Sequence, residues 1–414
     1  MMLSRERLKL SINHKEPDRI PIDLGGFRDS GIATIAYNKL RKKLGISSGF
    51  ARMYDFIMQL AYPEKEIRDI FHIDTIDAAQ AFLKNDDDWR EWTLNDGSRC
   101  LIPKYLNVET DKDLTVLLKN KDGLILGKKP KNSLYVDIAY NVYGSLQNIP
   151  QEINNDDIAK NMWSIPTPEW VANIFNDYGY ELFINNIKDL YESTDRAIIL
   201  HVGGALVRGM DLRGMENFLC DLCLDKKGVN RLFDKFVDEY LTTLDIVIKG
   251  VGKYIDILVF GDDMGTQVGP LISLDMFREL FKPRYKKMFD FVHNNSNCNV
   301  LFHSCGSVYE FIPDFIDMGI DILNPVQTDT ANMDSKVLKK EFGKYITFWG
   351  GGCNTKILTF GTPVEIKEDV KRRIDIFSKG GGFVFNPIHN ILANVPPENV
   401  IALFEAAYKY GFYK

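Results

Sequence analysis

The chain has 414 residues, with 51 lysines and arginines against 57 aspartates and glutamates, and its formal net charge is −6. Hydrophobic residues make up 45% and charged residues 26% of the chain, which excludes a disordered protein. The net acidity and the lack of a basic run argue against nucleic acid as a partner, because phosphate binding needs clustered lysines and arginines.

The sequence shows no targeting or membrane-spanning segment. Its N-terminal region is charged throughout and lacks the apolar stretch of a signal peptide, and no run of about 18 apolar residues occurs anywhere. Six cysteines in a chain of this length are too few for a disulfide scaffold. We therefore expect a reduced, cytoplasmic enzyme with no membrane partner.

The N-terminal part of the chain alternates helical and strand patterns. Residues 4–15 predict a short helix, and residues 20–24 form an apolar run that predicts a strand. Helices are expected over residues 32–44 and around residues 53–70, followed by a short apolar strand near residues 73–79.

Residues 86–143 have the pattern of antiparallel hairpins. Residues 89–94 and 99–102 alternate like strands and flank Asn95-Asp96-Gly97, a sequence that favours a tight turn. We interpret the region as a β insertion within a single domain that spans residues 1–414. Two roles are open for it: a lid or docking surface, or padding of the surface or of an oligomer contact.

From residue 196 onward, apolar strands alternate with amphipathic helices. This alternation predicts parallel βαβ units, and the two earlier strands bring the total to eight, the number in a TIM barrel. The expected fold class is therefore α/β, a TIM (β/α)8 barrel with an N-terminal helical extension and an antiparallel β insertion. The later strands are expected at residues 197–202, 255–260, 298–303, 319–323, 345–349 and 382–385.

Polar and metal-binding side chains follow these strands, where a TIM barrel builds its active site. His303 and Cys305 alternate at one strand end, so they point to the same face with Cα atoms roughly 6.5 Å apart. Cys353 follows another strand and a run of glycines, and could supply a third ligand. Three nitrogen and sulfur ligands with one open coordination position are typical of a catalytic zinc site. On spacing alone, an ordinary barrel-lining role for His303 and Cys305 stays open.

Three further residues at strand ends are candidates for catalysis. Asp262 and Asp263 form a pair of carboxylates that would perturb each other's pKa. Their functional interpretation is a proton donor to a leaving group, or a fourth metal ligand. A helix cap or a structural hydrogen-bond acceptor is the alternative for this pair. His389 could orient the substrate or hold its own loop. Cys220 and Cys223 lie in a helical pattern without a second pair, so we expect two buried, hydrophobic-like cysteines.

Both ends of the chain carry segments typical of one known family: RERLKLSINHKEPDRIPIDLGG, GDDMGTQVGPLIS, FHSCGSVYEFIPDFIDMGIDILNPVQ and NPIHNILANVPPENV. They resemble the uroporphyrinogen decarboxylase superfamily, whose fold is a TIM barrel. In that superfamily, true decarboxylases hold porphyrinogen carboxylates with an arginine-rich segment after the first strand. This chain has only Arg28 there, a departure that argues against porphyrinogen decarboxylation.

The chain also resembles the other branch of the superfamily, the zinc-dependent corrinoid methyltransferases, such as methylcobalamin:coenzyme M methyltransferase and the methyltransferase components of O-demethylases. Their zinc motif, His-x-Cys followed later by Cys, matches His303, Cys305 and Cys353. The resemblance implies transfer of a methyl group between a small methylated substrate, preferably a methyl ether, and the cobalt of a corrinoid (cobalamin) carried by a partner protein. The implied cofactors are Zn²⁺ and that corrinoid. Open alternatives are a decarboxylase of a tetrapyrrole or other carboxylic acid, a thiol methyltransferase using methylcobalamin, and a metal-binding homologue without turnover.

Overall fold

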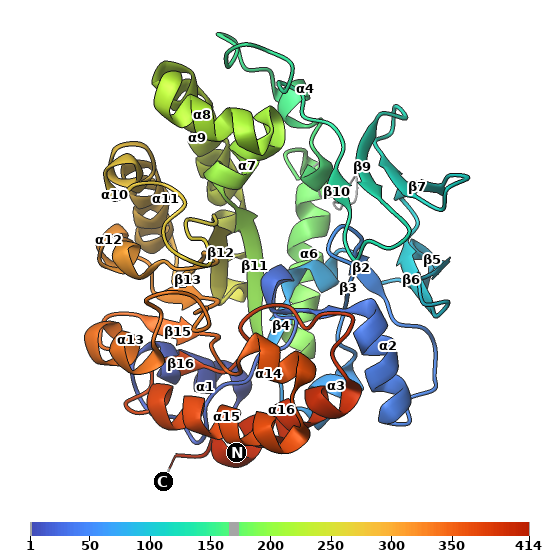
Figure 1. Cartoon of the computed structure of the whole chain (residues 1–414), viewed down its shortest axis with the longest axis vertical. Coiled ribbons are helices and arrows are strands. Elements are labelled where there is room, and N and C mark those ends of the chain that lie inside the picture. Colours follow the sequence, from blue (N-terminus) through green and yellow to red (C-terminus); the bar gives the residue numbers. More distant parts are fainter. Residues whose placement is uncertain (1, 165–173, 414) are drawn as a thin grey trace.

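The computed structural model describes residues 2–164 and 174–413, and its centre is a parallel β-barrel surrounded by helices (Figure 1). Seven strands form one parallel sheet in the order β16-β15-β14-β13-β12-β11-β4. Apart from β4, neighbouring strands follow one another in the sequence, as right-handed βαβ units require. The strands are β4 (Thr75–Asp77), β11 (Ala197–Gly203), β12 (Ile257–Gly261), β13 (Asn299–His303), β14 (Ile322–Asn324), β15 (Thr347–Trp349) and β16 (Phe383–Val384).

An extended segment near Ile22 closes this sheet into a barrel. On one side the Asp23 amide donates to the Phe385 carbonyl at 2.8 Å, and the Phe385 amide donates to the Pro21 carbonyl at 2.8 Å. On the other side the Asp74 amide donates to the Ile22 carbonyl at 2.8 Å. The segment therefore lies between β16 and β4 as the eighth strand. The eight strands and the TIM-barrel-like fold expected from the sequence are confirmed.

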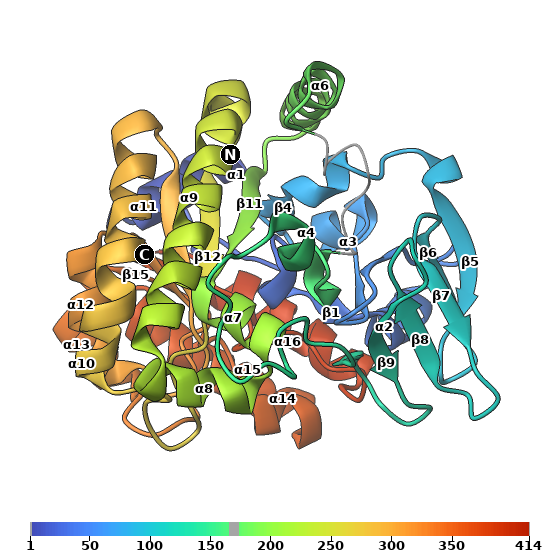
Figure 2. The same ribbon diagram turned by 90° about the horizontal axis from the view of Figure 1, so that it is seen from above.

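Helices cover the outside of the barrel between successive strands (Figures 1 and 2). The expected N-terminal helix is α1, which lies across one end of the barrel near both chain termini (Figure 1). The longer helices are α1 (Ser4–Ile12), α2 (Thr34–Lys43), α6 (Asp177–Ser193), α7 (Ala205–Arg213), α8 (Met215–Leu224), α9 (Lys226–Val251), α11 (Lys282–Asn295), α13 (Ser335–Phe342), α15 (Pro363–Phe377) and α16 (Pro397–Tyr410). Shorter ones are α3 (Lys65–Ile70), α4 (Asn155–Ile158), α10 (Leu274–Met276), α12 (Ile312–Met318) and α14 (Thr355–Phe360).

Alternate strand residues fill the barrel interior with apolar side chains. Ile199, Ile257 and Leu301 belong to one buried cluster, and Leu8 and Ile12 of α1 complete it. Because side chains of a strand alternate between two faces, the residues two positions further on also point inward. This periodicity carries functional side chains to the open end of the barrel, opposite α1.

The insertion at residues 86–143 forms two antiparallel sheets beside the barrel (Figures 1 and 2). Its hairpin pairs β5 with β6 around the expected Asn95-Asp96-Gly97 turn, and the second sheet has the order β10-β9-β8-β7. Apolar residues of both sheets pack on Met53, Phe56 and Ile57. The strands are β5 (Trp89–Thr93), β6 (Arg99–Pro103), β7 (Asn107–Thr110), β8 (Val116–Lys119), β9 (Ile125–Lys129) and β10 (Asp137–Ile138).

The prediction of a helix around residues 53–70 is wrong for most of that segment. β2 (Met53–Asp55) and β3 (Leu60–Ala61) pair there with β1 (Ile32–Ala33), and only α3 is helical. The amide of Leu101 in β6 donates to the Ala51 carbonyl at 2.8 Å, so the insertion covers the outer side of this small sheet. A segment covered on both faces buries nearly all of its residues, and such burial removes the one-sided pattern that distinguishes a helix.

The cysteines are all free, as their small number predicts. Cys100 and Cys298 are buried, but Cys220 and Cys223 are exposed, which corrects the expectation that they are buried. Both lie on the outer surface of α8, whose apolar face is supplied by Phe218 and Leu222 instead. None of the helices within residues 2–164 and 174–413 combines the length and the apolarity needed to cross a membrane.

Candidate metal and substrate site

His303, the last residue of β13, and Cys305, two residues further on, come together at the open end of the barrel. The Cys305 Sγ lies 3.4 Å from the His303 Nε2. Two ligands of one tetrahedral zinc, at about 2.0 Å for nitrogen and about 2.3 Å for sulfur, lie about 3.5 Å apart. The pair therefore has the separation that one bound zinc ion requires, before any side chain moves.

Asn324, at the end of β14, determines which nitrogen of His303 faces Cys305. Its Nδ2 donates to the Trp349 carbonyl at 2.9 Å, so its Oδ1 must be the atom that faces the imidazole. The His303 Nδ1 lies 2.6 Å from that Oδ1 and donates to it. The proton of a neutral imidazole is thereby held at Nδ1, and the lone pair of Nε2 is free for a metal.

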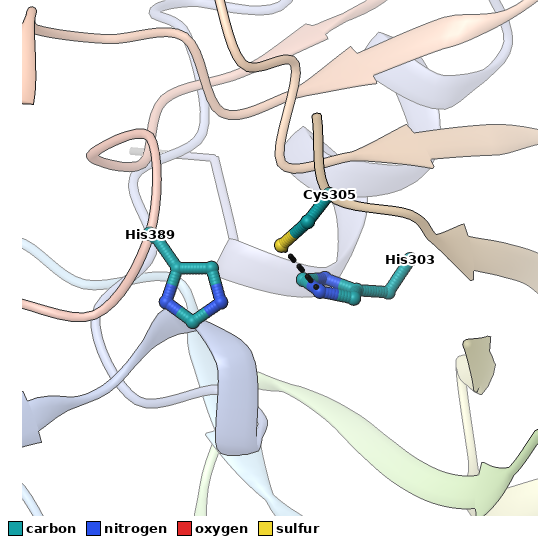
Figure 3. A group of neighbouring side chains, drawn as sticks. All are labelled: His303, Cys305 and His389. Atoms are coloured by element: carbon teal, nitrogen blue, oxygen red, sulfur yellow. Dashed lines mark hydrogen bonds between the residues drawn. The ribbon is translucent and has the colours of Figure 1, made fainter. Parts of the chain in front are cut away.

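His389 completes a group of three possible metal ligands. Its ring reaches the other two residues from the loop after β16, and the ligand atoms of the three residues all lie within 4.8 Å of one another (Figure 3). The His389 Nδ1 accepts a hydrogen bond from the Asn390 amide at 2.8 Å, which leaves Nε2 facing the group. Binding a metal through Nε2 therefore requires the ring proton to sit on Nδ1 and the Asn390 contact to open.

Cys353 lies outside this group. Its side chain is fully buried, and its Sγ donates to the Asn354 carbonyl at 3.6 Å. Burial, and next the negative charge of Asp369, raise the pKa of the Cys353 thiol far above its usual range. The structure thus brings together His303 and Cys305 of the expected ligand set, but it places His389 where Cys353 was expected.

Asp262 serves as an acceptor for the first turn of α7. One carboxylate oxygen accepts from the amides of Ala205 and Leu206, and the other accepts from Val207. The Tyr285 hydroxyl also donates to it. Burial raises the pKa of Asp262 to about 6, and these hydrogen bonds limit the rise. This is the helix-capping role that the sequence left open as the alternative to catalysis.

Asp263 lies beside the metal-ligand group. Its Oδ1 accepts a hydrogen bond from the Cys305 amide at 2.9 Å and lies 3.7 Å from the His303 Nε2. The Asp263 side chain is 48% exposed, so it also reaches solvent. Asp263 therefore fixes the backbone of one candidate ligand and contributes negative charge next to the other.

Asp29 is a member of the site that the sequence analysis missed. Its Oδ2 lies 3.9 Å from the His303 Nδ1 and 3.8 Å from the His201 Nε2. Burial alone would raise the pKa of Asp29, but His303, His201 and His389 outweigh burial and lower it. Its only sequence signal is its position after the first barrel strand.

The electrostatics of the group favour a positive charge. Burial would lower the pKa of His303, but Asp29 and Cys305 raise it well above its usual value. His201, by contrast, has a pKa lowered to about 4, first by burial and also by the positive charges of Arg28 and His303. The second imidazole therefore stays neutral next to a centre that attracts cations.

These residues line a cavity of about 670 Å³ at the open end of the barrel. His201, Asp263, His303 and His389 form one part of its wall, together with Asp29. Tyr54 and Asp55 of β2, with Met58 and Tyr62 close by in the sequence, supply another part, and helices α7 and α9 supply a third. The insertion packs behind the small sheet, so it supports the cavity wall from outside.

Comparisons with known proteins place this site in a family context. A family model described as uroporphyrinogen decarboxylase (URO-D) matches residues 200–410, which carry His201, Asp262, His303 and His389. No curated protein sequence matches the chain significantly. Among solved structures, a methyltransferase from Methanosarcina mazei is similar over 99% of both chains, with a TM-score of 0.59 at 16% sequence identity. At this identity the likeness concerns the fold.

Proposed function

Given that the chain belongs to the uroporphyrinogen decarboxylase family, we propose that it is a zinc-dependent methyltransferase. It moves a methyl group between a small methylated substrate, preferably a methyl ether, and the cobalt of a corrinoid carried by a partner protein. The observation that carries the proposal is the His303–Cys305 pair, whose 3.4 Å separation fits one zinc ion at the mouth of a substrate-sized cavity.

The zinc ligands in this proposal are His303 Nε2, Cys305 Sγ and His389 Nε2. Cys353 is replaced by His389, because His389 already lies within 4.8 Å of the other two ligands. Three protein ligands of nitrogen and sulfur leave one position open for a substrate atom, as in catalytic zinc sites. When bound, zinc acts as a Lewis acid that stabilises negative charge on the heteroatom that loses the methyl group.

The chain's own residues position the reactants. Asn324 holds the His303 ring, and Asp263 holds the backbone of Cys305. The exposed carboxylate of Asp263 is also the nearer of the two expected acids to the ligand group, so it is the one proposed to exchange a proton with the leaving atom. The same fold occurs in the Methanosarcina mazei methyltransferase, which is compatible with this chemistry.

The charges around the cavity favour methyl transfer over decarboxylation of a polyanion. The described cavity wall contains two arginines, and each already pairs with a carboxylate. Arg28 lies 2.7 Å from Asp55, and Arg208 lies 2.6 Å from Glu239. A substrate with several carboxylates would have to displace these ion pairs, and nothing in the described wall compensates for that loss.

The proposal is tested by incubating the zinc-loaded protein with a corrinoid reduced to Co(I) and a panel of methyl ethers, thiols and amines. Formation of methyl-Co(III) is followed by its absorption spectrum. We expect about one zinc per chain, and we expect Cys305→Ala to lose both the zinc and the spectral change. A protein that binds no zinc, or that transfers no methyl group from any member of the panel, would contradict the proposal.

A further inference from the structure

The cavity carries far more negative than positive groups. Its described wall contains seven carboxylates and two arginines, and both arginines are used in ion pairs with Asp55 and Glu239. Two other carboxylates, Asp29 and Asp263, lie within 4 Å of the candidate ligand His303. Their charges are compensated when a metal binds there.

Two of the remaining carboxylates are hydrogen-bonded to other parts of the protein. Asp262 accepts three backbone amide hydrogen bonds and one from Tyr285. Asp211 is hydrogen-bonded to the side chain of Trp163. Asp77 is the carboxylate that is left, and its charge acts on the buried Tyr54 hydroxyl, which has no hydrogen-bond partner among the described residues.

Asp77 is buried at the end of β4, with 6% of its surface exposed. One carboxylate oxygen accepts from the Ala79 amide at 2.8 Å, and within the described residues Asp77 forms no ion pair. The charged groups that act most strongly on it are Arg28, Asp55 and Asp23, and Arg28 is already bound to Asp55. Burial raises the pKa of Asp77 to about 7, and a cation bound next to the carboxylate would stabilise its charged form.

Tyr54, next to Asp77, gives a second and independent indication. Tyr54 lines the same cavity and is only 9% exposed, yet its hydroxyl has no hydrogen-bond partner among the described residues. Its ring stacks on Tyr62 with centroids 4.0 Å apart, and the charge of Asp77 acts on both hydroxyls. A buried hydroxyl without a partner is costly unless a ligand supplies one.

We propose that Asp77, Tyr54 and Tyr62 form a subsite for the ammonium group of a methylated substrate. N–H groups of the ammonium donate to the Asp77 carboxylate and to the Tyr54 hydroxyl, and the tyrosine rings cover its apolar neighbours. The statement that the methyl end of this substrate faces His303 and Cys305 rests on the proposed function. The recognition of the ammonium group is independent of the proposed function.

An ammonium group fits this subsite better than a neutral or an anionic group. It places a positive charge next to the Asp77 carboxylate and gives the Tyr54 hydroxyl a hydrogen-bond donor. A neutral hydroxyl could satisfy Tyr54 but would not stabilise the charged form of Asp77. An anion would lie against Asp77 and would need Arg28 to leave Asp55.

The test compares three methyl ethers of equal length: 2-methoxyethylammonium, 2-methoxyethanol and methoxyacetate. Their binding to the zinc-loaded protein is measured by calorimetry. We expect the ammonium ether to bind about tenfold to a hundredfold more tightly than the neutral ether, the range of one charge-assisted hydrogen bond, and methoxyacetate to bind most weakly. A neutral ether that binds as tightly as the ammonium ether, or three ethers that all fail to bind, would overturn the proposal.

Variants test whether Asp77 and Tyr54 cause the preference for the ammonium ether. Asp77→Asn should abolish the preference for the ammonium ether, and Tyr54→Phe should reduce it. Asp238→Asn, at a 75% exposed carboxylate of α9, should leave it unchanged. A preference that survives Asp77→Asn would refute the subsite. Because binding is measured apart from methyl transfer, a protein that prefers the ammonium ether but methylates no corrinoid would refute only the proposed function.

Discussion

The imidazole of His303 is held by Asn324, whose Oδ1 lies 2.6 Å from the ring Nδ1. The amide cannot turn round, because its Nδ2 donates to the Trp349 carbonyl on the neighbouring strand. Residues of three consecutive barrel strands, β13, β14 and β15, thus fix the ring so that the lone pair of Nε2 lies on the side of Cys305. Asn324 is therefore a positioning residue for the proposed metal.

Replacing Asn324 with alanine should weaken zinc binding without removing a ligand. Loss of such an orienting partner lowers metal affinity by about 10- to 100-fold, because the ring is no longer fixed in its binding tautomer. Competition with a chromogenic chelator measures this affinity. Asn399→Ala is a matched control, since Asn399 is also buried and donates to the Leu358 and Gly361 carbonyls. Equal zinc affinities of the two variants would contradict the role of Asn324.

His389→Ala should remove the third zinc ligand, whereas Cys353→Ala should leave zinc bound. The reason is the placement of His389 within 4.8 Å of the other ligands, while the Cys353 thiol is buried beside Asp369. Zinc content per chain after gel filtration distinguishes the two variants. Retention of zinc by His389→Ala together with its loss from Cys353→Ala would restore the ligand set expected from the sequence.

Asp262 and Asp263 should respond differently to conversion into the amide. Asp262→Asn should lower the free energy of unfolding by about 1–3 kcal/mol, because an amide nitrogen cannot accept the α7 backbone hydrogen bonds. Asp263→Asn should change stability little and lower the rate of methyl transfer. Urea unfolding and the corrinoid assay measure the two effects. An Asp262→Asn protein of normal stability that has lost its activity would make Asp262 the acid instead.

The pair of His293 and Asp321 should make stability depend on pH. The His293 Nε2 lies 3.0 Å from the Asp321 Oδ2, and this hydrogen bond raises the pKa of His293 above its usual value although burial opposes it. A raised folded-state pKa stabilises the fold below the unfolded-state pKa of about 6.5, and the contribution disappears as the pH rises through the folded-state pKa.

Urea unfolding of the wild type and of His293→Gln tests this pH dependence. The wild type should be the more stable protein at about pH 5.5, and the difference should shrink by about pH 8.5. The effect is small, because about a third of each side chain is exposed to solvent. A difference that grows with pH would show that the pair acts with the opposite sign.

The sequence by itself determined the parts of this protein that depend on short stretches of chain. The apolar runs and their spacing identified the eight strands, and the Asn95-Asp96-Gly97 turn identified the hairpin β5–β6. His303 and Cys305 were found because residues two positions apart on a strand point to the same face. This relationship can be read from the sequence without knowledge of the fold.

Only the tertiary structure decided the rest of the site. Asp29 and His389 are far apart in the sequence, and they meet because the first and last strands pair when the barrel closes, with Asn386 donating to the Asp23 carbonyl at 3.1 Å. The same closure sets His389, and not Cys353, beside Cys305. Residues 53–70 were mispredicted for a related reason: the insertion buries the second face of β2, and burial imposed from outside a segment leaves no local periodicity to detect.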